Sequence, residues 1–366
     1  MSSLLLIAFT SLLTQCGGGD DTPSDSVQSG GGGGDGDSGG SDSGGNNSGA
    51  SDSGGNSSGG NGSGGDSEGT LSEEYPGDVG MADDPAVVWM ENFEAGSVGE
   101  VLSRYDDHKN PAGMSLVADV PAESSGNQAL LMLASGAQEE ATDFYKNFGE
   151  NGYEEWYVRW YVKYVPGSPY HHTGVWFGGY NPPLDYPYPR AGTRPSGDDL
   201  FHIALEAISD RFDFYNYWMR MHSWSASEES FWGNTLVHDQ RTIFDDQWHC
   251  VEVHSKVNSD LSSSAGAELA LWIDDAHIAT FSETEGYGYW VADKFCLEDA
   301  DHSSCTDYPP TAGEDMIPLD LQVRDVEALK LNYFWPENFS TEGEETSVWY
   351  DDMVIATRRI GCIQIE

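Results

Sequence analysis

Hydrophobic and polar residues alternate along most of the chain after residue 75, which is the pattern of half-buried β-strands. Residues 156–165 are the clearest case: even positions up to 162 are Trp or Val, and odd positions up to 163 are Tyr, Arg or Lys. Pro166-Gly167 then ends the strand. The same period of two predicts strands at residues 211–224, 247–257, 268–281, 329–334 and 348–357. Asp274-Asp275 divides the run at 268–281 as the turn of a hairpin.

The 3.6-residue period of a helix is not sustained for more than two turns anywhere in the sequence. Many strands joined by loops of uneven length are typical of an all-β antiparallel β-sandwich or jelly roll. Residues 75–366 suit one domain of this class. Residues 17–74 have no aromatic residue, Lys or Arg and are mainly Gly, Ser, Asp and Asn, so we expect a disordered linker there.

The N-terminus carries an export signature. Residues 4–13 form an apolar run that is too short to span a bilayer but suits the core of a signal peptide. The stretch Leu13-Thr14-Gln15-Cys16 resembles the lipobox of bacterial lipoproteins. This resemblance implies that residues 1–16 are a signal peptide and that Cys16 is lipidated, so that lipid alone holds the protein on a bacterial outer membrane or cell surface. A chance cysteine in a disordered N-terminus is the alternative.

The charge of the chain excludes some partners. Its 62 acidic and 16 basic residues give a formal net charge of -46. Nucleic-acid binding needs a basic surface, and attraction to anionic lipid needs a basic cluster, so we expect neither. An acidic surface also keeps a protein soluble in salt, so the charge by itself names no ligand.

Four cysteines remain in the domain after Cys16. An even number of cysteines in an exported domain indicates disulfides. Cys296 and Cys305 flank a short polar loop and are expected to pair, which leaves Cys250 to pair with Cys362. A zinc site is the alternative, but the chain has no CxxC pair.

Several segments resemble a known fold family. Residues 247–254 followed by 269–275, the closing run 349–356 and the opening Asn92-Phe93-Glu94 resemble strands of concanavalin A-like lectin/glucanase domains, including polysaccharide-lyase-like jelly rolls. The resemblance covers roughly residues 86–365 and implies the fold rather than an activity, because this fold hosts lectins, hydrolases and lyases. Residues 176–183 and 190–195 resemble an uncharacterised bacterial branch.

The family's catalytic motifs are absent. Hydrolases of this fold carry Glu-x-Asp-x-x-Glu on one strand, and the nearest acidic pair here is Glu206 and Asp210. Alginate lyases carry Arg-x-Glu-Leu-Arg and Gln-Ile-His, which Phe201–Leu205 matches only weakly. Basic residues are nevertheless concentrated between positions 171 and 222, and a basic cleft in an acidic domain suits an anionic glycan.

A β-elimination needs a cation for the uronate carboxylate, a base and an acid. Under this interpretation Arg220 neutralises the carboxylate, His202 or His222 takes the proton, and Tyr180 serves the leaving oxygen. His202 and Glu206 share a strand face. The candidate substrate-binding residues are Trp176, Arg194, Glu206, Asn216, Trp218, Trp224 and Trp232.

The position of this site depends on one strand face. Asn216, Trp218, Arg220, His222 and Trp224 should lie on the same side of the strand predicted at 211–224. If that side faces the core, the site must move to the opposite side, which carries Tyr215 and Tyr217.

A calcium site is also expected. Sandwich domains of this family that open with Phe-Glu and close with Asp-Asp often hold a structural Ca²⁺ between the first and last strands. Glu94 and Asp352 match that arrangement, and Ca²⁺ prefers oxygen ligands.

From the sequence we therefore expect a monomeric surface lipoprotein that binds polysaccharide in a concave groove. A polysaccharide lyase acting on a uronate-containing glycan is the alternative, and a structural or adhesive envelope protein is the third possibility. A catalytic groove should bring Arg, His and Tyr within hydrogen-bond reach. A binding protein should instead show exposed rings, and a structural protein a large apolar patch.

Overall fold

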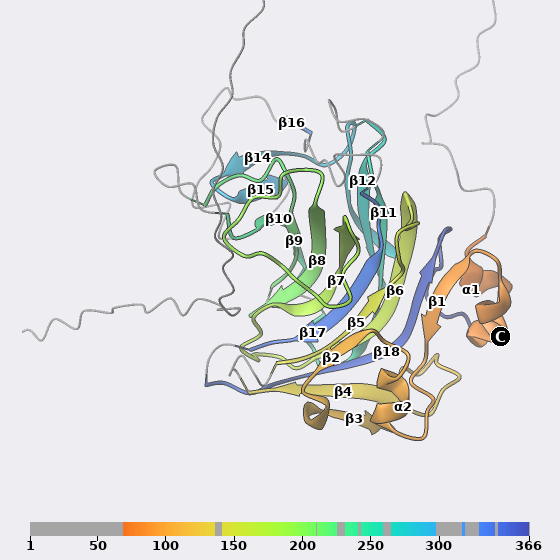
Figure 1. The fold of residues 1–366 in the computed structure, drawn as a ribbon. Coiled ribbons are helices and arrows are strands. Elements are labelled where there is room, and N and C mark those ends of the chain that lie inside the picture. The colour runs from red at the N-terminus through yellow and green to blue at the C-terminus, as the bar shows by residue number, and fades with distance from the viewer. Residues whose placement is uncertain are drawn as a thin grey trace, which may run out of the picture. The chain divides into compact units, whose positions relative to one another are not determined.

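Two β-sheets packed face to face form most of the described structure (Figure 1). The computed structural model describes residues 69–135, 141–209, 211–224, 231–240, 243–258, 265–297, 317–318, 329–340 and 343–365. The helices in these segments are short: α1 (Leu71–Glu74), η1 (Pro76–Asp78), η2 (Met81–Asp83), α2 (Val98–Leu102) and η3 (Pro111–Gly113). None of the described helices is long and apolar enough to cross a membrane.

The first sheet, sheet A, has the strand order β13-β12-β11-β6-β18-β4-β3, and β1 also pairs with β18. All of its described pairings are antiparallel. Its strands are β1 (Val87–Glu91), β3 (Met114–Val117), β4 (Ala129–Ala134), β6 (Glu155–Tyr164), β11 (Trp248–Lys256), β12 (Glu268–Ile273), β13 (Ala276–Phe281) and β18 (Thr346–Ala356).

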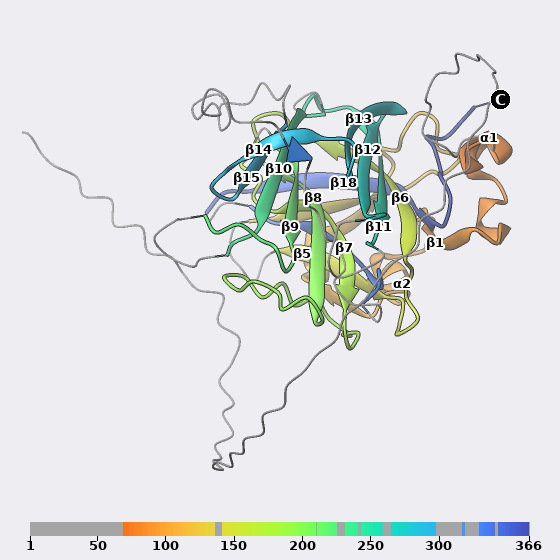
Figure 2. The ribbon, with the colours of Figure 1, turned by 90° about the horizontal axis from the view of Figure 1, so that it is seen from above.

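The second sheet, sheet B, has the order β16-β14-β15-β10-β9-β8-β7-β17-β5-β2. Its β10 and β15 are parallel. Its strands are β2 (Asp107–Lys109), β5 (Thr142–Asn147), β7 (Thr173–Tyr180), β8 (Leu200–Ile208), β9 (Arg211–Tyr217), β10 (Asn234–Gln240), β14 (Tyr287–Val291), β15 (Lys294–Leu297), β16 (Ile317–Pro318) and β17 (Tyr333–Asn338). Seen from above, β6, β11 and β12 lie on one side and β7, β8 and β9 on the other (Figure 2).

The all-β sandwich predicted from the sequence is confirmed. The alternation at 156–165 becomes β6, whose Trp156 and Trp160 are fully buried. The predicted hairpin becomes β12 and β13, joined at Asp274-Asp275. The predicted end of one strand is wrong: β9 stops at Tyr217 instead of 224, because the backbone turns there and Met221 N–H donates to Trp218 C=O at 3.3 Å.

The start of the described chain and its end are fastened to the outer side of β6. Residues 71–74, which composition assigned to the linker, form α1, and a capping box between Thr70 and Glu73 closes its first turn. The guanidinium of Arg159 is fully buried beneath this segment. It pairs with the Asp78 carboxylate and donates to the Gly361 carbonyl at 3.3 Å.

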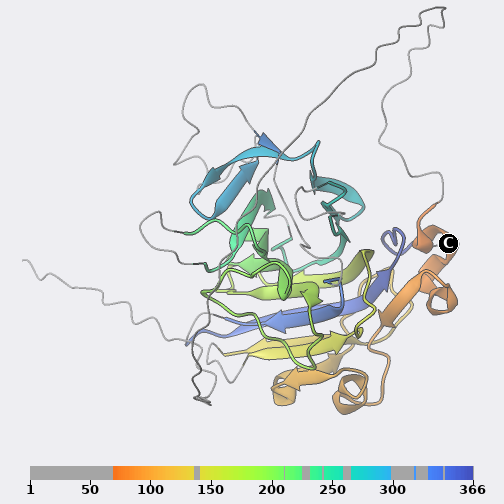
Figure 3. The same cartoon turned by 45° about the horizontal axis from the view of Figure 1, so that its top comes forward.

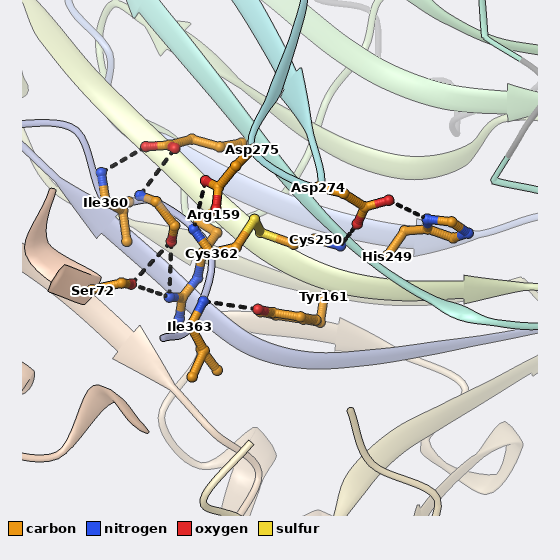
Figure 4. Close-up of a disulfide and its surroundings, with 12 residues drawn as sticks. Ser72, Arg159, Tyr161, His249, Cys250, Asp274, Asp275, Ile360, Cys362 and Ile363 are labelled. Atoms are coloured by element: carbon orange, nitrogen blue, oxygen red, sulfur yellow. Dashed lines mark hydrogen bonds and ion pairs between the residues drawn. A yellow bond between two sulfur atoms is a disulfide. The ribbon is translucent and has the colours of Figure 1, made fainter. Parts of the chain in front are cut away.

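The predicted disulfide between Cys250 and Cys362 is confirmed (Figure 4). It links β11 to the last described residues over a sequence separation of 112, so it restricts a large loop in the unfolded chain. The Glu252 carboxylate supports the same connection by accepting from Ile360 N–H at 2.7 Å and Gly361 N–H at 3.0 Å. Cys296 is also disulfide-bonded, and its expected partner Cys305 lies outside the described residues.

Candidate functional site

The face of sheet B that points away from sheet A carries four of the residues predicted from the sequence, Trp176, Tyr180, His202 and Glu206. Phe177 of β7 contacts Trp156 of sheet A, and Phe214 of β9 contacts Phe281 of sheet A. Successive side chains of a strand point to opposite faces. The outward positions of β7, β8, β9 and β17 are therefore Trp176 and Tyr180, His202 and Glu206, Tyr215 and Tyr217, and Tyr333 and Trp335.

Strand register arranges these outward residues in rows across the sheet. One row runs from Tyr333 through Gly178 and His202 to Tyr217. The next runs from Trp335 through Trp176 and Ala204 to Tyr215. Directly opposed side chains of paired strands lie within contact distance, so each row is a continuous line of neighbours.

His202 is the centre of the first row. The side chain is buried, and its Nδ1 lies 2.6 Å from the Tyr333 hydroxyl. Its Nε2 is buried without a close, well-aligned hydrogen bond, although the Tyr188 backbone acts on the ring as a hydrogen-bond partner. Burial lowers the pKa of His202 to about 3, so the imidazole is neutral at pH 7. The rings of Tyr180 and Tyr217 lie 5.1 and 6.0 Å from the imidazole, between ring centroids. A neutral imidazole with one nitrogen free of a close hydrogen bond, beside two phenols, can exchange protons with a bound ligand.

A loop, residues 181–199, lies over this end of the outward face. Figures 1 and 3 show it in light green in front of β7, β8 and β9. Tyr188 N–H donates to the Tyr180 hydroxyl at 2.7 Å, and the Tyr145 hydroxyl donates to the Leu184 carbonyl at 3.0 Å. Burial raises the pKa of Tyr180, so this phenol holds its proton at neutral pH.

Arg190 brings a positive charge to the same place. Its guanidinium pairs with the Asp199 carboxylate. Its charge acts on both His202 and Tyr180, and it helps to keep the pKa of His202 low after the larger effect of burial. This arginine was not among the site residues predicted from the sequence. It is a cation close enough to act on His202 and Tyr180, whereas Arg220 lies exposed beyond the end of β9.

A second polar group lies at the other end of β7. His172 Nδ1 lies 3.0 Å from both carboxylate oxygens of Glu206, and its ring is 5.2 Å from that of Tyr215. Burial alone would lower the pKa of His172, but the Glu206 carboxylate outweighs burial and raises it. Burial lowers the pKa of the adjacent His171 to about 4.

A row of acidic residues crosses the sheet beside this group. The register aligns Asp143, Glu337, Gly174, Glu206 and Asp213 on five neighbouring strands. Burial, reinforced by the charges of Asp143 and Glu206, raises the pKa of Glu337 well above its usual range. Burial likewise raises the pKa of Asp143 to about 7. The face is therefore less negative at neutral pH than its number of carboxyl groups suggests.

Part of the predicted site lies elsewhere. Asn216 and Trp218 are buried, and Asn216 lies on the face that packs toward sheet A, because alternation from outward Tyr215 and Tyr217 places it there. Arg220, His222 and Trp224 are exposed beyond the end of β9. The expectation that these five residues share one strand face is wrong, because the strand ends at Tyr217. His222 instead stacks on Trp290, with ring centroids 3.8 Å apart.

The structure separates the predicted rings into two groups. Trp176 is only 4% exposed and lies among the outward aromatic rows, 5.4 Å from Trp335 between ring centroids. Trp224 and Trp232 are 53% and 42% exposed. Arg194 lies with its guanidinium carbon 5.1 Å from the centre of the Phe231 ring. Trp224 and Trp232 are therefore the predicted rings that solvent reaches.

The sequence analysis missed several residues of this face. Tyr145, His172, Arg190, Tyr333 and Trp335 were not selected as site residues. His172 had been noted only as one of a group of basic residues, and Tyr333 and Trp335 lie in a strand that was predicted to start and end earlier. The alternation at 173–180 was the available signal for this face of the sheet, because it places Gly174, Trp176, Gly178 and Tyr180 on one side of a strand.

The expected calcium ligands have partly suitable surroundings. The buried Asp352 has one carboxylate oxygen, Oδ2, without a hydrogen-bond partner, and burial raises its pKa, with Glu94 contributing in the same direction. Glu94 Oε1 accepts the Gln128 N–H at 2.8 Å. In the part of the chain that the structure describes, no three His, Cys, Asp or Glu side chains gather around one point as metal ligands. A calcium ion would need backbone carbonyls and water to complete its six to eight oxygens.

Comparisons with known proteins give a distant likeness in fold. No protein-family model matches the chain, and no curated protein matches it. An alginate lyase from Aplysia kurodai is 13% identical, with a TM-score of 0.46 over 74% of this chain and 99% of that one. An endo-β-1,4-glucuronan lyase from Trichoderma reesei is 13% identical, with a TM-score of 0.40 over 74% and 96%. The calreticulin globular domain of T. cruzi is 11% identical, with a TM-score of 0.40 over 74% and 88%. Such values assign no activity.

Proposed function

We propose that this protein is a polysaccharide lyase that cleaves a uronate-containing glycan by β-elimination on the outward face of sheet B. The observation that carries the proposal is His202, a buried neutral imidazole whose Nε2 makes no close, well-aligned hydrogen bond, with only the backbone of Tyr188 in the covering loop acting on the ring beside Tyr333. An unsatisfied buried polar atom is unfavourable unless a ligand completes it. The two phenols beside it, Tyr180 and Tyr217, extend the site's capacity for proton transfer.

The residues have distinct roles in the reaction. His202 Nε2 takes the proton from C5 of the uronate, and the electron pair of that C–H bond forms the double bond between C4 and C5. The C4–O bond breaks with its electrons on the leaving oxygen, which receives a proton from the Tyr180 hydroxyl. Arg190 turns from Asp199 to the uronate carboxylate and stabilises the charge that develops during proton removal. Tyr333 holds the imidazole through Nδ1.

Loop 181–199 must move for the glycan to reach His202. The described attachments of the loop include the hydrogen bond from Tyr188 to Tyr180, those from Tyr145 and Asn147 to the Leu184 carbonyl, and the β-bridge of Gly192 with Phe231. Each such bond contributes only about 0.5–1.5 kcal/mol net, so opening is compatible with turnover. The cover would also exclude water from the reacting atoms once it closes.

The test is incubation of the purified protein with uronate polymers of different linkage and epimer, while the absorbance of the unsaturated uronate product is followed. The proposal expects this absorbance to rise with at least one polymer and shortened chains to appear in parallel. Shortened chains without the absorbance would indicate hydrolysis. No cleavage of any uronate polymer would reject the lyase.

A binding protein without catalysis is the second candidate. The exposed rings of Trp224 and Trp232 favour it, since sugars stack on accessible aromatic faces. Retention of a glycan together with no unsaturated product over long incubation would select this candidate. If the protein neither retains a glycan nor forms the unsaturated product, the structural or adhesive envelope protein is the remaining candidate.

A lipid anchor at Cys16 and a structural calcium at Glu94 and Asp352 belong to the same proposal. Cys16 lies outside the described residues. Replacement of Cys16 by Ala should move the protein from the membrane fraction to the soluble fraction, and wild-type protein that incorporates no fatty-acid label would reject the anchor.

Calcium should raise the melting temperature of chelator-treated protein, because binding to the folded state alone stabilises it, and Asp352→Asn should abolish the shift. An equal shift in the variant would contradict this site.

A further inference from the structure

An exposed aromatic and basic surface lies beside loop 181–199. Gly192 of the loop forms a β-bridge with Phe231, and a Cβ on Gly192 would lie 3.5 Å from the Trp232 ring. Gly192 has φ +82, a backbone conformation that glycine adopts without strain, so the indole packs against a position with no side chain. Trp232 nevertheless remains 42% exposed.

Two further rings of the loop are open to solvent. Tyr186 is 55% exposed and Tyr188 is 52% exposed. Tyr188 is held through its backbone, because its N–H donates to the buried Tyr180 hydroxyl. The backbone is thus fixed while the ring stays accessible, which is an arrangement suited to a contact surface rather than to the core.

Arg194 has an unusual environment for this protein. The chain has 62 acidic residues, yet among the described residues Arg194 forms no ion pair, and its guanidinium lies over the Phe231 ring instead. An arginine stacked on an aromatic ring keeps its planar N–H groups free for a carboxylate. An exposed charge that no acidic residue in the described segments pairs with is therefore available to an anionic ligand.

We infer that Tyr186, Tyr188, Arg194 and Trp232 form a glycan-holding surface, the loop platform, which binds an acidic polysaccharide outside the reaction centre. The rings take the apolar faces of the sugars, and Arg194 takes a carboxylate by paired hydrogen bonds. The choice of uronate as the acidic sugar rests on the proposed function. The platform itself rests on exposure and charge alone, and it would bind whether or not His202 is catalytic.

The experiment measures binding of the full chain to an immobile uronate polymer by affinity electrophoresis. The matched ligand is the same polymer after its carboxyl groups have been reduced to alcohols. All proteins carry His202→Gln so that no polymer is cleaved. Trp232→Ala should weaken binding to both polymers about 5- to 20-fold, a range that corresponds to about 1–2 kcal/mol. Arg194→Gln should weaken binding to the uronate polymer about 3- to 10-fold and leave the reduced polymer unaffected.

Two variants control for general effects of losing a ring or a charge. Tyr287→Ala removes a ring that is 43% exposed on β14, and Lys256→Gln removes a half-exposed cation on sheet A. Both should bind like the parent protein. Equal losses in Tyr287→Ala and Trp232→Ala, or an Arg194→Gln effect that is the same on both polymers, would overturn the platform.

Failure of the platform can be distinguished from failure of the lyase. If the wild type cleaves the polymer but the Arg194 and Trp232 variants bind normally, the lyase is supported and the platform is rejected. Selective binding without cleavage leaves the platform and rejects the lyase. Retention of a sulfated neutral polymer in place of the uronate polymer would reject the uronate as ligand.

Discussion

Replacement of His202 by glutamine is expected to lower kcat/KM on a uronate polymer by about 10²–10⁴-fold, the range for loss of a general base. Glutamine preserves a polar side chain of similar length, which can still contact the Tyr333 hydroxyl, but it cannot accept a proton at neutral pH. The measurement is the initial rate of the unsaturated product at substrate concentrations below KM. The KM itself should change little, because His202 acts on the reacting C–H bond.

His277→Gln is the matched control, since His277 is an exposed histidine of β13 on sheet A that bonds only Thr280 among the described residues. This variant should retain the parent rate. Should His202→Gln keep a rate within about twofold of the parent while remaining folded by near-ultraviolet circular dichroism, another group must be the base. Tyr333→Phe should give a smaller loss, because it only frees Nδ1 from its partner.

The pH dependence gives an independent check on the same residue. Because burial lowers the pKa of His202 to about 3, its imidazole stays neutral as the pH falls from 7 to 5. The rate should therefore lack the acid limb near pH 6.5 that an unperturbed histidine base would produce. Stability, unlike the rate, should depend on pH in this range. The unfolded chain takes up a proton at His202 below about pH 6.5, while the folded chain does not. The contribution of His202 to the free energy of unfolding therefore decreases as the pH falls from 6.5 toward 3.

The sequence predicted the elements that local pattern alone determines. The period of two at 156–165 became β6, and Asp274-Asp275 became a hairpin turn, because each depends on residues that are adjacent in the chain. The pairing of Cys250 with Cys362 followed from the local pairing expected of the other two cysteines. These features needed no knowledge of which face of a sheet is buried.

Locating the site required knowing which face of each strand is buried, and the sequence pattern did not show this. The strand predicted at 211–224 carries buried-type Phe212 and Phe214 but also Arg220 and His222 on its even-numbered side, so the pattern could not tell which side is buried. The contact of Phe214 with Phe281 of the other sheet decides it, and this contact joins residues 67 positions apart. Likewise, Arg190 reaches Tyr180 and His202 only because loop 181–199 folds back over β7.

The largest expected loss of stability comes from Asp78→Asn, which should lower the free energy of unfolding by about 3 kcal/mol, the lower end of the range for a broken buried ion pair. The guanidinium of Arg159 and the Asp78 carboxylate are 0% and 2% exposed, so the variant leaves a buried positive charge whose remaining hydrogen-bond partners are neutral, with only the Asp352 carboxylate acting on it at longer range. Asparagine is the suitable replacement because Asp78 has φ 58, a conformation that Asn tolerates better than Ala.

The measurement is the urea unfolding curve of the wild type and the variant, compared at equal slope. Asp83→Asn is the control, because Asp83 lies exposed in the next 3₁₀ turn and should change stability by less than about 0.5 kcal/mol. A loss below about 1 kcal/mol in Asp78→Asn would mean that the hydrogen bonds from Arg159 to Ser72 at 3.1 Å and to the Asp352 carbonyl at 3.0 Å suffice to hold the charge. Combining Arg159→Leu with Asp78→Asn should destabilise less than Asp78→Asn alone, because no buried charge then remains unpaired and position 78 keeps a residue that tolerates its positive φ.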